Sequence, residues 1–414
     1  MAGASERHLR DARAILDRAP FVDGHNDLLW ELRLRVGYDF GRLDIEAPQP
    51  GLMTDIERIR AGRLGGQFWS VYVPSDLPGD QAVTATLEQI DALFRMVDRY
   101  PETFELARTA DDVVRATARG RVASMIGVEG GQSIGGSLGA LRTLARLGAA
   151  YMTLTHNDNT AWADSATDRA EHGGLTAFGE EVVREMNRLG ILVNLSHVSA
   201  DTMRHAIEAS AAPVIFSHSN TRARADVLRN VPDDVLELVR DRDGIVMVTF
   251  VPEFLNDAGA AAWWGQFHEM ERLRASHPGD REALEAGMKT WGETHSAPSA
   301  SVGDVADHID HIRDIAGIEH IGVGGDFDGT PNVPQGLADV STYPALFAEL
   351  LSRGYSEREC ALISQGNVLR VMREAAAVAQ RLQSERGPSL ARLVDPVAES
   401  AAPAGPAEGS TQGA

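Results

Sequence analysis

Eight short runs of β-branched and aromatic residues, separated mostly by helical patterns, constrain the fold of this chain more than any other feature. The runs begin near Phe21, Gln67, Val122, Tyr151, Ile191, Pro213, Ile245 and His320. Strands that alternate with helices pair in parallel through crossover connections. Eight such strands predict an α/β fold that closes into a (β/α)8 TIM barrel. An open doubly wound sheet is the alternative.

Two of the intervening segments carry clear apolar stripes at helical spacing. Residues 176–190 repeat apolar side chains every three or four positions and end at Gly190, a residue type that commonly follows a helix. Residues 305–312 show the same spacing. His308 and His311 lie among charged residues in this second segment, so we expect them on its solvated face.

Two long connections interrupt the alternation, and both are expected at the mouth of the barrel. One follows the first strand, and the other, residues 252–301, follows the seventh. The second contains Trp263, Trp264 and Phe267, which could line a pocket, although the sequence favours local packing beneath a long loop. Residues 281–289 are rich in helix formers and predict a helix inside this connection.

The charge balance argues against several classes of function. The chain of 414 residues has 39 Lys and Arg against 60 Asp and Glu, a formal net charge of −21. An acidic chain offers no broad basic surface, so neither nucleic acid nor a membrane is an expected partner. No stretch approaches the roughly 20 apolar residues that a bilayer span needs, and charges interrupt the first 22 residues. We therefore expect a cytoplasmic protein.

The number of cysteines limits the possible metal ligands and disulfides, and the composition of the C-terminus indicates where the folded domain ends. Cys360 is the single cysteine, so an intramolecular disulfide and a thiolate-rich metal site are excluded. We expect it to be a small buried residue. Residues 1–395 are predicted to form the barrel domain. Residues 396–414, rich in Ala, Pro, Gly and Ser, are predicted to form a flexible tail.

Residues able to bind metals or transfer protons follow six of the eight runs. In DGHNDLLW, His25 and Asp27 are two apart, and a strand would place both on one face. The other five runs lead to Glu129, His156, His197, His218 and Asp326. Barrel enzymes build their sites at the carboxyl ends of the strands. We therefore expect these seven side chains to converge.

The convergent set suits divalent cations. Imidazole and carboxylate without sulfur fit Zn²⁺, Mn²⁺, Co²⁺ or Fe²⁺, with zinc as the default. A carboxylate can bridge two ions, so we predict two ions around Glu129. His25 and Asp27 would complete the first site, and His197 and His218 would complete the second. Such a pair would carry a shared hydroxide as nucleophile.

Helix capping is the alternative explanation for polar residues after strands. Ser and Asp often cap the following helix, and Ser196, Ser199 and Ser219 could do so. Capping does not explain four histidines and a glutamate at strand ends in a chain with 13 histidines in total. The pattern therefore favours a metal site.

The succession of motifs resembles the renal or membrane dipeptidase family, a branch of the amidohydrolase superfamily. The motifs are DGHNDLLW, GRLGGQFWSVYVP, GVEGG, LTHNDNTAWADS, LSHVS, FSHSN, RNVPDD and GGDFDG. They follow the family's order through nearly the whole predicted barrel. The resemblance implies a (β/α)8 barrel with two zinc ions, in agreement with the residue pattern.

The resemblance also implies roles for individual residues. The zinc ligands that it implies are His25 and Asp27 for the first ion, His197 and His218 for the second, and Glu129 as the bridge. His156 matches a histidine that contacts the scissile carbonyl, and Asp326 matches the acid/base. Arg229 of RNVPDD matches an arginine that holds the substrate carboxylate. On its residue type alone, an ion pair of Arg229 with Asp233 or Asp234 would be equally open.

The implied activity is metal-dependent hydrolysis of L-Xaa-L-Xaa and L-Xaa-D-Xaa dipeptides, and a homodimer is plausible only by resemblance. Animal members are secreted, lipid-anchored and disulfide-bonded, whereas Asp158 stands here where a cysteine is usual. Another binuclear amidohydrolase activity, on β-lactams, lactones or phosphoesters, is the nearest alternative. A non-catalytic dipeptide-binding protein is a second one, and the presence of His156 and Asp326 beside the metal ligands argues against it.

Overall fold

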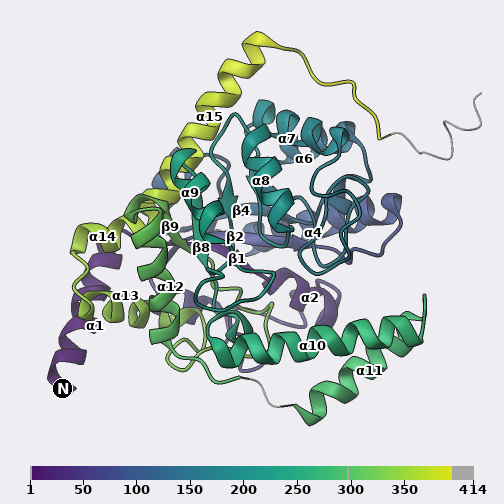
Figure 1. Cartoon of the computed structure of the whole chain (residues 1–414). Coiled ribbons are helices and arrows are strands. Elements are labelled where there is room, and N and C mark those ends of the chain that lie inside the picture. The colour runs from purple at the N-terminus through teal and green to yellow at the C-terminus, as the bar shows by residue number, and fades with distance from the viewer. Residues whose placement is uncertain (1, 296–297, 394–414) are drawn as a thin grey trace, which may run out of the picture.

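The predicted strands close into a barrel of eight parallel strands surrounded by helices (Figure 1). The computed structural model describes residues 2–295 and 298–393. The barrel strands are β1 (Phe21–Asn26), β2 (Leu64–Tyr72), β4 (Val122–Glu129), β5 (Ala149–Thr153), β6 (Leu192–Asn194), β7 (Ile215–Phe216), β8 (Ile245–Val248) and β9 (Ile321–Val323). Pairing of β2 with β4 closes the ring, so the open sheet is excluded.

A ninth strand, β3 (Phe104–Leu106), is absent from the sequence-based expectation. It pairs with the first three residues of β4, and β5 pairs with the later part of the same edge. It therefore widens the wall at the start of β4 without entering the ring. Three residues are too few for an alternating pattern to be visible in the sequence.

Helices follow most strands, and most of them cover the outside of the barrel (Figure 1). They are α1 (Ala2–Arg18), α2 (Leu28–Val36), α3 (Ile56–Ala61), α4 (Gly79–Arg99), α5 (Ala110–Ala118), α6 (Leu138–Leu147), α7 (Ala177–Leu189), α8 (Ala200–Ala209), α9 (Asp233–Asp241), α10 (Asp257–Ser276), α11 (Arg281–Thr294), α12 (Val302–Ile315), α13 (Tyr343–Ser352), α14 (Glu357–Ala361) and α15 (Asn367–Glu385). Gly190 ends α7 in the left-handed region, as the sequence predicts.

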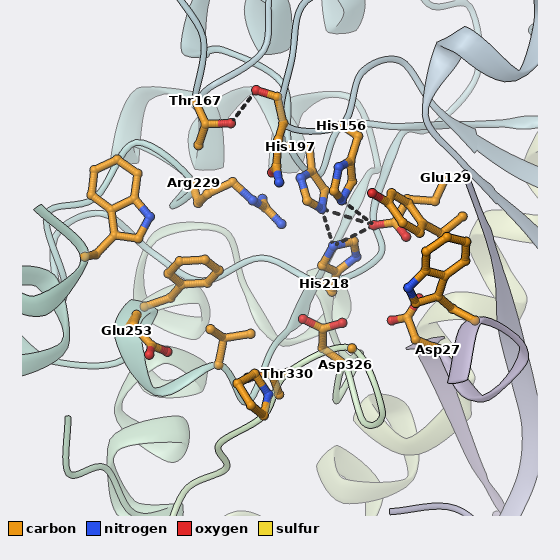
Figure 2. A pocket seen from close by; sticks show the side chains of 18 of the residues that line it. Asp27, Glu129, His156, Thr167, His197, His218, Arg229, Glu253, Asp326 and Thr330 are labelled. Carbon is orange, nitrogen blue, oxygen red and sulfur yellow. Dashed lines mark hydrogen bonds and ion pairs between the residues drawn. The ribbon is translucent and has the colours of Figure 1, made fainter. Parts of the chain in front are cut away.

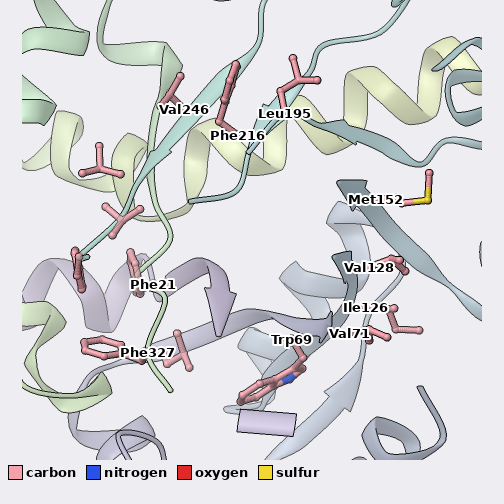
Figure 3. Packing of buried hydrophobic residues seen from close by; sticks show 14 of the residues in the cluster. Phe21, Trp69, Val71, Ile126, Val128, Met152, Leu195, Phe216, Val246 and Phe327 are labelled. Atoms are coloured by element: carbon pink, nitrogen blue, oxygen red, sulfur yellow. The ribbon is translucent and has the colours of Figure 1, made fainter. Parts of the chain in front are cut away.

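Side chains along each strand alternate between the barrel interior and the helical shell. In β4, Met125 packs inside with Phe68 of β2. Its neighbours Ile126 and Val128 pack outward in the cluster between strands and helices (Figure 3). Each large apolar side chain removed from water contributes roughly 1.5–3 kcal/mol. This alternation leaves the carboxyl ends of the strands as the place where polar side chains can meet.

The connection after β8 forms an antiparallel pair of helices beside the barrel, α10 and α11 (Figure 1). The helix predicted over residues 281–289 is confirmed and extends to Thr294. Trp263 is buried and stacks on Phe267, with ring centroids 5.1 Å apart. Both pack in a small cluster that includes Trp264, as expected, but Trp263 and Phe267 also line the main pocket.

The prediction that His308 lies on a solvated face is wrong. Its side chain is fully buried on the inner side of α12. The position is three residues after Val305 and four before Ile312, so it continues the apolar stripe of the helix. His311 is only partly buried, and its Nε2 hydrogen-bonds to Asp233 Oδ1 at 2.8 Å.

Other expectations have simpler outcomes. Cys360 is fully buried, as predicted. The predicted tail, residues 396–414, lies outside the described residues, so the domain boundary stays a prediction. No helix within residues 2–295 and 298–393 combines the length and the apolarity needed to cross a bilayer.

The buried His308 predicts a loss of stability in acid. Nε2 of the neutral ring donates to the Leu255 carbonyl at 3.0 Å, and Nδ1 accepts from the Thr221 backbone at 3.1 Å. Burial lowers the pKa of His308 from 6.5 to about 4. Between these values the unfolded chain binds a proton that the folded chain excludes, so stability falls as pH falls through this window, by about 3 kcal/mol.

Urea unfolding of wild type and His308→Gln between pH 7 and pH 4 tests this prediction. The wild-type free energy of unfolding should drop more steeply, because the Gln amide does not titrate. Parallel pH profiles for the two proteins would contradict it.

Candidate active site

The carboxyl ends of the barrel strands and the loops after them bring the predicted site residues together at one end of the barrel. Seven of them line a pocket of about 560 Å³, and His25 lies buried beneath it. The seven are Asp27, Glu129, His156, His197, His218, Arg229 and Asp326 (Figure 2). The volume is in the range of small-molecule sites.

His25 and Asp27 meet for a different reason from the predicted one. His25 lies in β1, but Asp27 follows the strand as the residue that precedes α2. The two therefore do not share one face of a strand. The turn into α2 instead brings Asp27 Oδ2 to 3.3 Å from His25 Nε2. The Asp27 side chain makes no capping hydrogen bond to α2, so its carboxylate oxygens are available to bind a metal ion.

The capping alternative applies to one of the three serines. Ser199 precedes α8 and accepts a hydrogen bond from its first turn. Ser196 and Ser219 precede no helix and hydrogen-bond to each other at 3.1 Å. Helix capping therefore accounts for the Ser199 hydroxyl but not for the histidines at the strand ends.

Glu129, the last residue of β4, lies at the centre of the cluster. Its Oε2 is 3.3 Å from His25 Nε2. Its Oε1 is 3.1 Å from His197 Nε2 and 3.5 Å from His218 Nε2. The two oxygens thus face different imidazoles. A carboxylate that bridges two metal ions must present one oxygen to each ion in this way.

The donor set fits two divalent cations. Burial is the largest factor that lowers the pKa of His197 and His218 well below the ordinary value, which leaves both rings neutral at pH 7. Their Nε2 atoms lie only 2.9 Å apart, and a neutral imidazole nitrogen beside a carboxylate is a typical zinc donor. Three overlapping groups have ligand atoms within 4.8 Å of one another: His25, Glu129 and His218; Glu129, His156 and His197; and His25, Asp27 and Asp326.

Tyr151 fixes the orientation of the His25 ring. His25 Nδ1 lies 2.9 Å from the Tyr151 hydroxyl, which in turn donates to the Gly24 carbonyl at 3.2 Å. With Nδ1–H donating to Tyr151, the lone pair of Nε2 faces the cluster. A side chain at Gly127 would come within 2.4 Å of the Tyr151 ring, so glycine is needed beneath it.

Asp326 reaches the pocket from the loop after β9 with an uncommon backbone conformation. Its φ is 61°, and His197 has a φ of 71°. Such left-handed values are rare for residues other than glycine and concentrate at functional sites. Burial is the largest factor that raises the pKa of the Asp326 carboxyl well above the ordinary value, and the charges of Asp27 and Glu129 add to it.

Arg229 is a buried cation that faces the cluster. It is only 3% exposed, and its Nη1 has no hydrogen-bond partner within the described part of the chain. Burial lowers its pKa to about 10, so it stays charged at pH 7. Asp233 and Asp234 pair with other side chains, and the alternative ion pair of Arg229 is therefore wrong. An unpaired buried guanidinium is suited to a carboxylate ligand.

Asp158, which stands where the resembling family usually has a cysteine, joins three segments beside the pocket. It accepts a hydrogen bond from Ser75 after β2. Its Oδ1 lies 3.2 Å from Arg274 Nη2 on α10. A polar contact thus connects the loops after β2 and β5 with the helical pair.

Several pocket residues were not singled out by the sequence. They include Trp30, Tyr72, Glu253, Asp328 and Thr330. The predicted site used the ends of six strands and left two without a candidate. Tyr72 ends β2, and Glu253 follows β8. Applying the same strand-end rule to those two strands would have found both residues.

The role of Tyr151 predicts weaker metal binding in Tyr151→Phe. Loss of a partner that orients a ligating histidine typically weakens metal affinity by about 10- to 100-fold. Zinc affinity measured by competition with a chromophoric chelator should show this loss. Tyr100→Phe is the matched control, because Tyr100 is also buried but hydrogen-bonds to Asp44 away from the cluster. Equal affinities in the two variants would contradict the role.

Comparisons with known proteins agree with the site. The chain matches Membrane dipeptidase (Peptidase family M19) over residues 9–386. It is 41% identical over 383 residues to Dipeptidase 3 of Mus musculus, a match that covers 91% of this chain and 69% of the mouse protein.

Two solved structures are similar over most of the chain. The probable dipeptidase PvdM of Pseudomonas aeruginosa has a TM-score of 0.79 and 25% identity, covering 90% of this chain and 100% of that one. A metallo peptidase of Rhodobacter sphaeroides, liganded with a phosphinate mimic of the dipeptide L-Ala-D-Ala, has a TM-score of 0.71 and 26% identity. That match covers 86% of this chain and 99% of the other. The chain therefore belongs to the membrane dipeptidase family, peptidase family M19, and is a hydrolase of the metallo-dipeptidase class.

Proposed function

We propose that this protein hydrolyses dipeptides of the L-Xaa-L-Xaa and L-Xaa-D-Xaa classes with the help of two zinc ions. The observation that carries the proposal is Arg229, a buried cation with an unpaired N–H in the same pocket as the histidine and carboxylate cluster. The dipeptide mimic bound by the Rhodobacter sphaeroides relative supports a substrate of this size.

The cluster provides ligands for both ions. His25 and Asp27 would hold one ion, His197 and His218 the other, and Glu129 both. When bound, the ions would lower the pKa of a water molecule and polarise the scissile carbonyl. Ser70 donates to Glu129 Oε2 at 2.9 Å and so fixes the orientation of the bridging carboxylate.

Two further side chains would act on the peptide bond itself. His156 lines the pocket, and burial lowers its pKa, so its ring is neutral and can donate a hydrogen bond to the carbonyl oxygen as negative charge develops there. Asp326 would accept a proton from the attacking water as the new C–O bond forms. It would then return that proton to the amine nitrogen as the C–N bond breaks.

Arg229 would position the substrate. A guanidinium holds a carboxylate through two parallel hydrogen bonds, and such charge-assisted pairs are stronger than neutral ones. A free C-terminal carboxylate bound at Arg229 places the peptide bond of a dipeptide near the cluster. A longer peptide would put an amide at this place. The chain is therefore expected to prefer dipeptides with a free C-terminus.

Product release from matched L,L and L,D dipeptides and their C-terminal amides tests the proposed activity. We expect the zinc-loaded protein to cleave the free dipeptides and the chelated protein to lose this activity. The amides should be poor substrates. Cleavage of β-lactams, lactones or phosphoesters in the absence of dipeptide cleavage would instead support the alternative hydrolase activity. Full activity of the chelated protein would exclude the metal-dependent reaction.

Asp326→Asn is expected to lower kcat by about 10²- to 10⁴-fold, the usual range for loss of a general acid/base. The amide keeps the size of the side chain but cannot take up the proton. Steady-state kinetics should be paired with the zinc content of the purified variant. A loss of kcat with two zinc ions retained supports the proton-transfer role, and unchanged kcat contradicts it.

Arg229→Lys is expected to lower kcat/KM for dipeptides by roughly 10- to 100-fold, because a charged hydrogen bond is worth about 1.5–3 kcal/mol and Lys lacks the planar fork. Arg224→Lys is the matched control, since Arg224 pairs with Asp307 outside the pocket. An equal effect of the two substitutions would contradict carboxylate recognition by Arg229.

A further inference from the structure

The pocket contains a carboxylate that the proposed mechanism does not use. Glu253 lies in the loop after β8 and lines the same cavity as Arg229. Figure 2 shows it on the opposite side of the pocket from Asp27 and Glu129. It belongs to none of the three groups of candidate metal ligands.

Glu253 is not paired with Arg229. The charges that act on Arg229 are those of Asp326 and Glu129. The pKa of Glu253 is raised by burial, opposed only by a hydrogen bond to its own backbone. Glu253 thus has no cationic partner among the described residues.

The other two acidic residues that line the pocket outside the cluster have partners. Glu31 forms an ion pair with Arg35, and Asp328 accepts a hydrogen bond from the Met53 backbone at 2.7 Å. A partly buried carboxylate without a cation is unfavourable unless a ligand supplies one. Of these three carboxylates, only Glu253 has neither a cation nor a hydrogen bond from another residue within the described part of the chain, so it is the one that a ligand cation would neutralise.

The backbone holds Glu253 in place. A Cβ at Gly259, in the first turn of α10, would lie 3.1 Å from the Glu253 Cα. The start of α10 therefore packs directly on this turn. This packing fixes the backbone of Glu253 at the pocket wall.

The walls around Glu253 suit a long aliphatic stem. Phe254, Trp263, Phe267 and Met270 line this side of the pocket. The ring of Phe254 also lies 5.4 Å from the guanidinium carbon of Arg229. Apolar walls with a charge at the end match Lys and Arg side chains, which bury their methylenes and keep a cationic tip.

We propose that Glu253 selects dipeptides whose C-terminal residue is Lys or Arg. This inference rests on the proposed function, because Arg229 must hold the C-terminal carboxylate for that residue's side chain to point toward Glu253. The substrate stem would pack between the aromatic walls, and its cation would pair with the Glu253 carboxylate.

Steady-state kcat/KM for Ala-Lys and Ala-norleucine, with the second residue in the L or the D form, tests the proposal. Norleucine keeps an unbranched aliphatic stem and lacks the cation. Wild type should prefer Ala-Lys by about tenfold, the effect of one modest charged hydrogen bond. Glu253→Gln should abolish the preference by lowering kcat/KM for Ala-Lys alone. Glu253→Lys should reverse it, in favour of Ala-Glu over Ala-Lys.

Glu271→Gln is the matched control, because it removes one negative charge from α10 outside the pocket. It should leave the preference unchanged. Equal kcat/KM for the two dipeptides in wild type would overturn the role of Glu253, and so would an unaltered ratio in Glu253→Gln. Absence of cleavage of every dipeptide would instead overturn the proposed function. The wild-type ratio does not depend on whether a variant folds.

Discussion

The burial of the Glu129 carboxylate is the constraint on which the rest of the site depends. A buried charge is costly unless opposite charges or hydrogen bonds compensate for it. Burial would raise the pKa of Glu129, but the imidazoles around its two oxygens, foremost those of His25 and His197, hold it well below the ordinary value. The β2–β4 pairing sets Glu129 opposite Tyr72 at the carboxyl end of both strands. The strand pair that closes the barrel therefore also positions the central carboxylate of the cluster.

Much of the architecture could be predicted because its causes are local. Short apolar runs bounded by turns gave the eight strands, and the strand-end rule brought Glu129, His197 and His218 together. His308 was misjudged because charged neighbours concealed a position on the apolar stripe. Tyr151 could not be recognised, because a tyrosine inside a strand looks like any other core residue until the partner of its hydroxyl is known.

The lack of a partner for Glu253 could not be predicted from the sequence. Its type and place after a strand were visible, but its lack of a partner depends on which cations the fold brings near. Zinc as the metal and the number of ions rest on the chemistry of the ligand set and on the resemblance, and the homodimer rests on the resemblance alone. The cytoplasmic location follows from composition alone. These therefore stay predictions.

The contact between Asp158 and Arg274 makes the link between α10 and the loop after β5 sensitive to the salt concentration. Ionic contacts between partly exposed groups weaken as dissolved salt screens them. A covalent sulfur bridge responds instead to the thiol–disulfide balance of its surroundings. Because α10 is joined to the loop after β5 through Asp158, this attachment loosens in concentrated electrolyte and is indifferent to reductants. The link between α10 and the loop after β5 therefore responds to the ionic strength of the medium and not to its redox state.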